Sequence, residues 1–228
     1  KDEWADIEET IRKRNVAFVL SGLTGTNAAQ NEAGKNIFKR PDPSPGPAVT
    51  GVRQTSTNST YDIPLSFGAG VRVGISPRWS IGAGMNYSML SRKFYGTYTK
   101  VNEAGVIENS TSTDIRNTQH YIGIPVNAYY DILDSRKVNF YAYAGGTVEK
   151  CISDRYDILG TSIVHKEKAD GMQWSANLGV GVSFKLGKHL GLYIDPSLRY
   201  YFDCDQPHNI RAAQPLMLGF EVGLKAYL

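Results

Sequence analysis

The sequence predicts an all-β protein: an eight-stranded antiparallel up-and-down transmembrane β-barrel with a short N-terminal helix. Three observations favour this fold. From Leu216 to Leu228 every second residue is apolar, which indicates a strand with one apolar and one polar face. The same alternation recurs in segments of about ten residues, the length of a strand that crosses a membrane. Long polar connections alternate with short ones, as they do between the strands of membrane barrels.

The chain divides into a short N-terminal part, residues 1–14, and a barrel domain, residues 15–228. Trp4, Ile7 and Ile11 fall on one face at helical spacing. Residues 1–14 are therefore expected to form a helix or the stub of a longer N-terminal region.

Eight strands are expected along the barrel domain, and all but the first alternate between apolar and polar residues. They are placed at residues 15–24, 61–75, 79–88, 119–132, 138–149, 173–186, 190–202 and 216–228. The apolar face continues across each short turn, which a chance pattern would rarely achieve. The polar segments between the strands are expected to be long loops, at residues 25–60, 93–117, 151–171 and 203–214.

The polar face of these strands indicates which face points into the barrel. It consists of Gly, Ser and Asn with scattered Tyr, whereas a face in bulk water would carry more Lys, Glu and Thr. The interior of an eight-stranded barrel is just wide enough to be filled by side chains. Its expected charges form a balanced network: Arg72, Lys185, Arg199 and Lys225 against Asp131, Glu149, Asp195 and Glu221. The alternative is a soluble lipocalin-like barrel with its apolar face inward.

Aromatic residues near strand ends support the membrane interpretation. Interface aromatics are expected at Trp79, Trp174, Tyr200 and Phe202, all on the apolar face. No apolar run is long enough for a transmembrane helix, but barrel strands do not produce such runs. The net charge of +3 and the lack of a basic cluster with interleaved aromatics argue against a nucleic-acid partner. A monomer is expected.

Several segments resemble the bacterial outer-membrane β-barrel domain family. They are residues 62–73, 76–79, 81–90, 121–126 and 140–146, and the resemblance extends over about 60–228. It implies a porin-like or OmpA/OmpX-type small barrel in the outer membrane of a Gram-negative cell envelope, and it brings no catalytic residues. The chain opens Lys1-Asp2-Glu3-Trp4 without a visible signal peptide, so such a location requires that the targeting segment has been removed.

Three glycine pairs superficially suggest a dinucleotide-binding loop. Gly68-Ala-Gly70, Gly82-Ala-Gly84 and Gly179-Val-Gly181 each lie inside an expected strand with no helix after it, so the fingerprint fails. Inward glycines that make room in a narrow barrel explain them better.

The two cysteines, Cys151 and Cys204, exclude a multi-cysteine zinc site and are a possible disulfide. They are expected at the outer ends of two strands with one strand between them, which places their backbones about 10 Å apart. That separation exceeds disulfide reach unless the loops bend inward.

The four histidines lack metal-ligand spacing. A Ser/His/Asp set could be assembled at the outer rim from His120, His208 and either Asp203 or Asp205, but a barrel this polar offers such sets by chance. No catalytic residue, cofactor or metal is expected.

The function expected from these patterns is non-enzymatic: a barrel that binds an extracellular ligand or protein through its long loops, or that has a structural role in the envelope. Its other partner is the outer-membrane lipid. The alternatives are a narrow porin or hydrophobic-ligand transporter, a rim enzyme that modifies lipid or cleaves peptide, and the soluble barrel.

Overall fold

Antiparallel strands make up almost all of the computed structural model, which describes residues 16–26, 50–187, 189–204 and 209–227. The strands are β1 (Val16–Thr26), β2 (Gly51–Tyr61), β3 (Leu65–Gly74), β4 (Trp79–Val101), β5 (Ile107–Asp134), β6 (Val138–Ile158), β7 (Val164–Glu167), β8 (Gln173–Lys185), β9 (Leu190–Tyr201) and β10 (Leu216–Tyr227). A short helix, α2 (Ile210–Ala213), lies between β9 and β10. The all-β antiparallel class is confirmed, and the helix expected at 1–14 lies outside the described residues.

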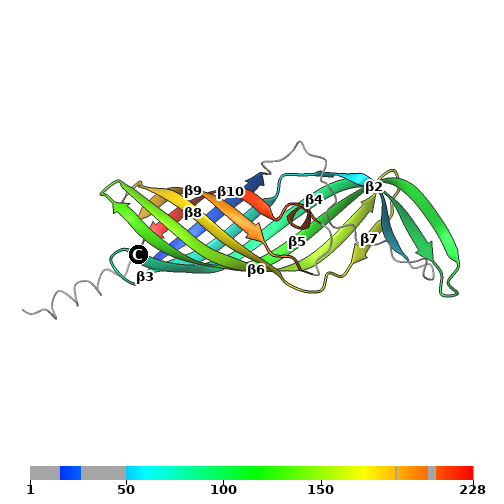
Figure 1. Ribbon diagram of the computed structural model, residues 1–228, viewed down its shortest axis with the longest axis horizontal. Helices are drawn as coiled ribbons and strands as arrows, with labels where there is room; N and C mark the ends of the chain where they lie inside the picture. The colour runs from blue at the N-terminus through cyan, green and yellow to red at the C-terminus, as the bar shows by residue number, and fades with distance from the viewer. Residues whose placement is uncertain (1–15, 27–49, 188, 205–208, 228) are drawn as a thin grey trace, which may run out of the picture.

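Eight of the strands pair in a closed series that leads back to the first strand. We call these eight paired strands the circuit. The pairs are β1–β3, β3–β4, β4–β5, β5–β6, β6–β8, β8–β9, β9–β10 and β10–β1, all antiparallel. Leu20 on β1, for example, lies opposite Ala69 on one side and Leu224 on the other. Figure 1 shows these strands inclined to the long axis of the molecule. The described part of the chain holds ten strands rather than eight, because β2 and β7 pair outside this circuit.

Three strands are far longer than the sequence predicted, and they carry the sheet beyond the circuit. β4, β5 and β6 have 23, 28 and 21 residues. With β2 and β7 they build a protruding sheet, here called the extension, from residues 51–61, 90–119 and 151–167 (Figure 1, right). The loops predicted at 93–117 and 151–171 are thus wrong over most of their length, and the one at 25–60 contains β2.

The cause of this error is an exchange of polarity between the two faces of each long strand. On β5, Ile122 and Ile132 are exposed on the outer face of the circuit. In the extension, earlier on the same strand, Ile115 is fully buried on the inner face. Phe94 and Tyr156 join Ile115 in an apolar cluster inside the extension. The outer face of the extension is polar and resembled a loop in the sequence.

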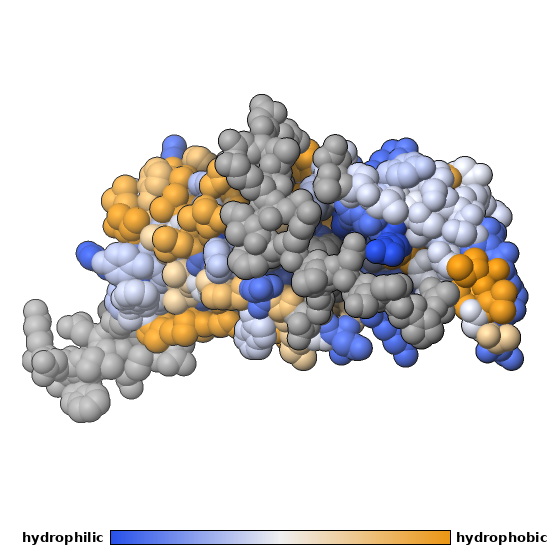
Figure 2. All heavy atoms as spheres, turned by 45° about the vertical axis from the view of Figure 1, so that its right-hand side comes forward, coloured by the Kyte–Doolittle hydropathy of each residue, from blue (hydrophilic) through white to orange (hydrophobic). Residues whose placement is uncertain are grey.

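Around the circuit the outer face is apolar and exposed. We call this surface the belt; its members include Phe67, Ile81, Met85, Ile124, Phe140, Leu178, Val180, Leu198, Phe220 and Leu224. Figure 2 shows apolar atoms concentrated over this half of the molecule, whereas the extension is mostly hydrophilic. Exposed apolar surface of this extent is typical of a barrel whose outer face contacts lipid.

Inside the circuit, tyrosines lie across the backbones of glycines on the neighbouring strand. Tyr143 is opposite Gly179 and Tyr141 is opposite Gly181 in the β6–β8 register. A Cβ added at Gly179 would lie 2.6 Å from the Tyr143 ring, and one at Gly181 would lie 2.5 Å from the Tyr141 ring. The inward glycines therefore make room for aromatic rings in a narrow interior, as expected from the sequence.

Replacing one of these glycines should be costly. For Gly181→Ala we expect a loss of about 1–3 kcal/mol in the free energy of unfolding, because the new methyl group overlaps the Tyr141 ring. Urea unfolding of the refolded protein in lipid vesicles measures this. Gly187→Ala is the matched control, since a Cβ there meets no atom within 4 Å. Equal effects of the two substitutions would contradict the packing argument.

Candidate functional site: the interior and its outer mouth

Tyr141 is the centre of a hydrogen-bonded chain in the interior. Lys225 Nζ donates to Tyr141 Oη at 2.9 Å, and this hydroxyl donates to Asp195 Oδ1 at 2.5 Å. The Lys225 ammonium also lies over the rings of Tyr141 and Tyr193, 4.2 and 4.6 Å from their centroids. Opposite charges are thus linked through a buried phenol, which compensates for their removal from water.

Two further acids of the expected network also have polar partners. Arg72 Nη2 lies 2.9 Å from Asp131 Oδ1, and the guanidinium covers the Tyr129 ring at 4.2 Å. Glu221 Oε1 accepts a hydrogen bond from Tyr193 Oη at 2.6 Å. These contacts give each of the two acids a polar partner inside the circuit.

Lys185 is placed differently from the expectation. Its side chain is 29% exposed at the short-turn end and pairs with Asp134 at 2.7 Å. Asp134 was not among the residues that the sequence analysis singled out. Lys185 therefore neutralises an acid at the short-turn end of the circuit and not the acids at its centre.

A second polar group closes the outer mouth of the interior, the end from which the extension projects. Arg211 from α2 forms two contacts with Glu149: Nη1 lies 2.8 Å from Oε2, and Nη2 donates to Oε1 at 3.2 Å. The two side chains are 2% and 0% exposed. Ser88 Oγ also donates to Glu149 Oε1 at 3.0 Å. A fully buried carboxylate is thus neutralised by a cation that arrives from a loop, through one hydrogen bond and a second close contact between charged atoms.

The loop that delivers Arg211 is held in place by its own cap. Asn209 Oδ1 accepts from the backbone N–H groups of Arg211 and Ala212, while Asn209 Nδ2 donates to Tyr121 Oη at 2.8 Å. The Arg211 guanidinium lies between the rings of Tyr121 and Tyr201, 4.8 and 4.7 Å from their centroids. We call residues 209–213 the plug. The sequence analysis missed it, and the capping Asn was the only local signal.

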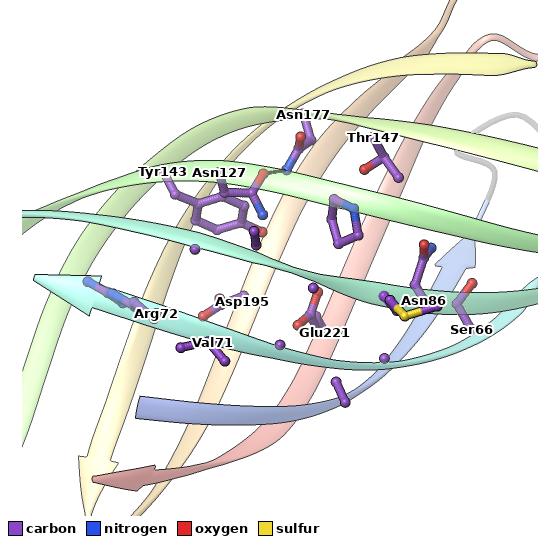
Figure 3. Close-up of a pocket in the computed structure, with 18 of the residues that line it drawn as sticks. Ser66, Val71, Arg72, Asn86, Asn127, Tyr143, Thr147, Asn177, Asp195 and Glu221 are labelled. Atoms are coloured by element: carbon purple, nitrogen blue, oxygen red, sulfur yellow. Dashed lines mark hydrogen bonds between the residues drawn. The ribbon is translucent and has the colours of Figure 1, made fainter. Parts of the chain in front are cut away.

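A cavity of about 80 Å³ remains between these groups (Figure 3). Arg72 lies toward one end of it and Asn86 and Ser66 toward the other, with Asp195 and Glu221 between them. Arg199, the remaining member of the expected network, is buried and also lines it. At about 30 Å³ per water molecule, this space has the volume of two or three waters.

The structure places the two cysteines in different surroundings. Cys151 is buried in the apolar cluster beneath the plug, together with Leu90 and Ile210. Cys204 is half-buried, and its Sγ donates to Gln173 Oε1 at 3.2 Å. Each thiol therefore has its own surroundings, and a bridge between them stays a prediction.

Thiol labelling tests the state of the cysteines. From the structure we expect one rapid modification, at Cys204, and a second at Cys151 only after unfolding, because reaction requires access to the thiolate. The measurement is mass spectrometry after maleimide treatment, with and without reductant. A folded protein that takes up no label until it is reduced would show the disulfide instead.

The four interface aromatics are all exposed on the belt. Trp79 and Trp174 are 52% and 57% exposed, at the short-turn and extension ends of the circuit respectively. Tyr200 and Phe202 meet edge to face with ring centroids 5.3 Å apart. These positions suit rings at the two edges of an apolar layer.

The rim histidine does not form a triad in the described part of the chain. His120 lies on the outer face, and its Nδ1 is 2.5 Å from Tyr87 Oη. Two other members of the candidate set, Asp205 and His208, lie outside the described residues. Among the residues the structure describes, no cluster of His, Cys, Asp and Glu could hold a metal ion, and no helix is long and apolar enough to cross a membrane.

Beyond the belt, burial and ion pairing shift the pKa values of two groups in the extension. Burial raises the pKa of Asp154, which accepts hydrogen bonds from Asn117 and Gln119. The hydrogen bond to Glu108 and its charge raise the pKa of exposed Lys100. Asp154 is only 1% exposed, so this part of the extension is shielded from water.

An apolar outer belt around a polar, hydrogen-bonded interior defines the protein as a membrane β-barrel. The family model described as "Outer membrane protein beta-barrel domain" matches residues 20–202. The chain belongs to this family, and its location is the bacterial outer membrane.

Similar solved structures come from the same class of protein. They include neisserial surface protein A (12% identity over 93% of this chain and 96% of that one, TM-score 0.46). Ail of Yersinia pestis, in complex with the heparin analogue sucrose octasulfate, is 11% identical over 94% and 99%, with a TM-score of 0.43. The outer-membrane protease OmpT of Escherichia coli is 11% identical over 95% and 97%, with a TM-score of 0.41. No curated protein matches the sequence.

Proposed function

We propose that the protein is a monomeric, non-enzymatic outer-membrane barrel that binds an extracellular partner through its extension. In this proposal the circuit of eight strands is the membrane-spanning barrel, and β2 and β7 belong only to the extension. The expected charge network, with Arg211 added, is the filling of the barrel rather than a transport path. The cavity of about 80 Å³ supports this, because an open channel needs continuous water.

The orientation follows from the lengths of the connections. The turns at residues 75–79, 134–138 and 185–190 are short, and all lie at the end opposite the extension. Short turns face the periplasm in outer-membrane barrels, and long connections face the outside. The extension and the plug would then be at the cell surface.

The observation that carries the binding role is the exposed apolar tip of the extension. Val106 and Ile107, in the hairpin between β4 and β5, are 59% and 53% exposed, far from the belt. Figure 2 shows apolar atoms gathered at this end within an otherwise hydrophilic surface. A contiguous apolar patch that contacts neither lipid nor the core supports a protein-binding surface.

A paired substitution at the tip tests the proposal. Cells that display the Val106→Ser/Ile107→Ser protein should lose binding to an array of immobilised serum and cell-surface proteins, while the barrel folds normally. The matched control, Val106→Ile/Ile107→Val, keeps an apolar tip and should bind as the unaltered protein does. Binding that survives in the Ser variant, or its absence from the unaltered protein, would overturn the proposed role.

A further inference from the structure

The outer face of the sheet carries a cluster of cations immediately beyond the belt. We call it the basic patch; its members are Lys93, Arg116, Arg155 and Lys166, all exposed. They come from β4, β5, β6 and β7, which are adjacent in the sheet. Residues separated by dozens of positions in the sequence are thus brought onto one surface.

Within the basic patch, like charges lie directly opposite one another. Lys93 is opposite Arg116 in the β4–β5 register, and Arg155 is opposite Lys166 in the β6–β7 register. Like charges at such cross-strand positions are destabilising. Nearby negative charge would reduce the repulsion within these two pairs of cations.

The described part of the chain supplies little of that negative charge. Asp157 lies opposite Arg116 in the β5–β6 register and pairs with Arg155, with 2.7 Å between Nη2 and Oδ1. Asp114 lies opposite Tyr95 and farther from the belt. No described carboxylate forms an ion pair with Lys93, Arg116 or Lys166. An external anion would remove the remaining repulsion.

The distance of the basic patch from the edge of the belt indicates where that anion comes from. Met89 is the last belt residue on β4, and Lys93 follows it by four residues. On β5, His120 lies opposite Met89. Thr118, two residues farther from the belt, lies opposite Arg155. At about 3.3 Å per residue along strands tilted about 40°, these side chains start roughly 5–10 Å beyond the apolar layer. The polar headgroup region of a bilayer is about 5–8 Å thick on each side. The basic patch is therefore at headgroup level.

We propose that the basic patch binds the phosphate groups of a phosphorylated lipid in the outer leaflet, with its acyl chains lying along the belt below. Arg and Lys on one surface are suited to phosphate, since guanidinium groups contact it in a bidentate manner and ammonium groups add charge. The inference rests on the proposed orientation, which exposes this face to the outer leaflet.

The test is a titration of the detergent-solubilised full chain with bis-phosphorylated lipid A, followed by native mass spectrometry. The variant Lys93→Gln/Arg116→Gln/Arg155→Gln should bind at least about tenfold more weakly, because charge-assisted contacts to phosphate are lost. The matched control removes three exposed cations from the short turns at the other end: Arg78→Gln/Arg136→Gln/Lys137→Gln. Its affinity should stay within about twofold of the original.

Further titrations separate the possible ligands. Dephosphorylated lipid A should bind no better to the unaltered protein than to the triple variant, and inorganic phosphate should not displace lipid A. Equal binding of the dephosphorylated lipid, displacement by inorganic phosphate, or equal losses in the two triple variants would each overturn the inference. If the triple variant fails to fold, Arg116→Gln alone is measured, with Arg136→Gln as its control. A barrel that folds in lipid but shows no preference for lipid A defeats this inference and leaves the proposed function standing.

Discussion

Arg211→Met should destabilise the folded barrel by about 3–5 kcal/mol, because it leaves Glu149 charged and buried without its cation. The midpoint of urea unfolding in lipid vesicles reports this loss. Adding Glu149→Gln to the same chain should recover much of it, since the uncompensated charge is then gone. Non-additivity in this double-mutant cycle is the signature of a buried pair.

The chain contains a matched exposed pair. Lys100 and Glu108 are also 2.8 Å apart, but their side chains are 58% and 44% exposed. Lys100→Met should leave the unfolding midpoint nearly unchanged, because surface ion pairs contribute little. If Arg211→Met behaves like Lys100→Met, the plug does not hold the outer mouth closed.

Val180→Arg should destabilise the protein by about 2–4 kcal/mol in a bilayer, the cost of a cation at the midplane of a barrel's lipid face. Val180 is 57% exposed on β8, midway between Trp174 and Leu186 at the two edges of the belt. The measurement is urea unfolding from vesicles, with refolding yield as a second readout. The cost arises only if lipid surrounds this residue.

Tyr95→Arg is the control for that prediction. Tyr95 is 47% exposed on the outer face of β4, but it lies in the extension, beyond the belt. Its replacement should change stability by less than about 0.5 kcal/mol, as surface substitutions usually do. Equal costs at Tyr95 and Val180 would contradict the boundary drawn between belt and extension.

The alternation of the sequence predicted the faces of the circuit well because the period of a strand is exactly two. Leu198 and Phe220 are on the outer face, and Asp195 and Lys225 are on the inner face, as expected. What alternation could not provide is the identity of the partners. That the Tyr141 hydroxyl links Lys225 to Asp195 depends on strands brought together by the fold, not by sequence neighbours.

The extension and the plug were missed for different physical reasons. In the extension the strands continue, but water replaces lipid outside and an apolar cluster replaces the polar interior. A polar run that includes exposed Arg116 was therefore read as loop, although Ile115 beside it is fully buried. The plug has a helix of only four residues, too short for helical periodicity, and Arg211 gains its role from Glu149 far away in the chain.

Gel migration of the detergent-solubilised protein with and without boiling tests most directly whether the circuit of strands is a membrane barrel, with circular dichroism on the same sample. We expect a strand-rich spectrum and a compact unboiled species that migrates more slowly once boiled. A strand-rich protein that stays monodisperse without detergent and shows no change on boiling would contradict the claim and favour a soluble barrel.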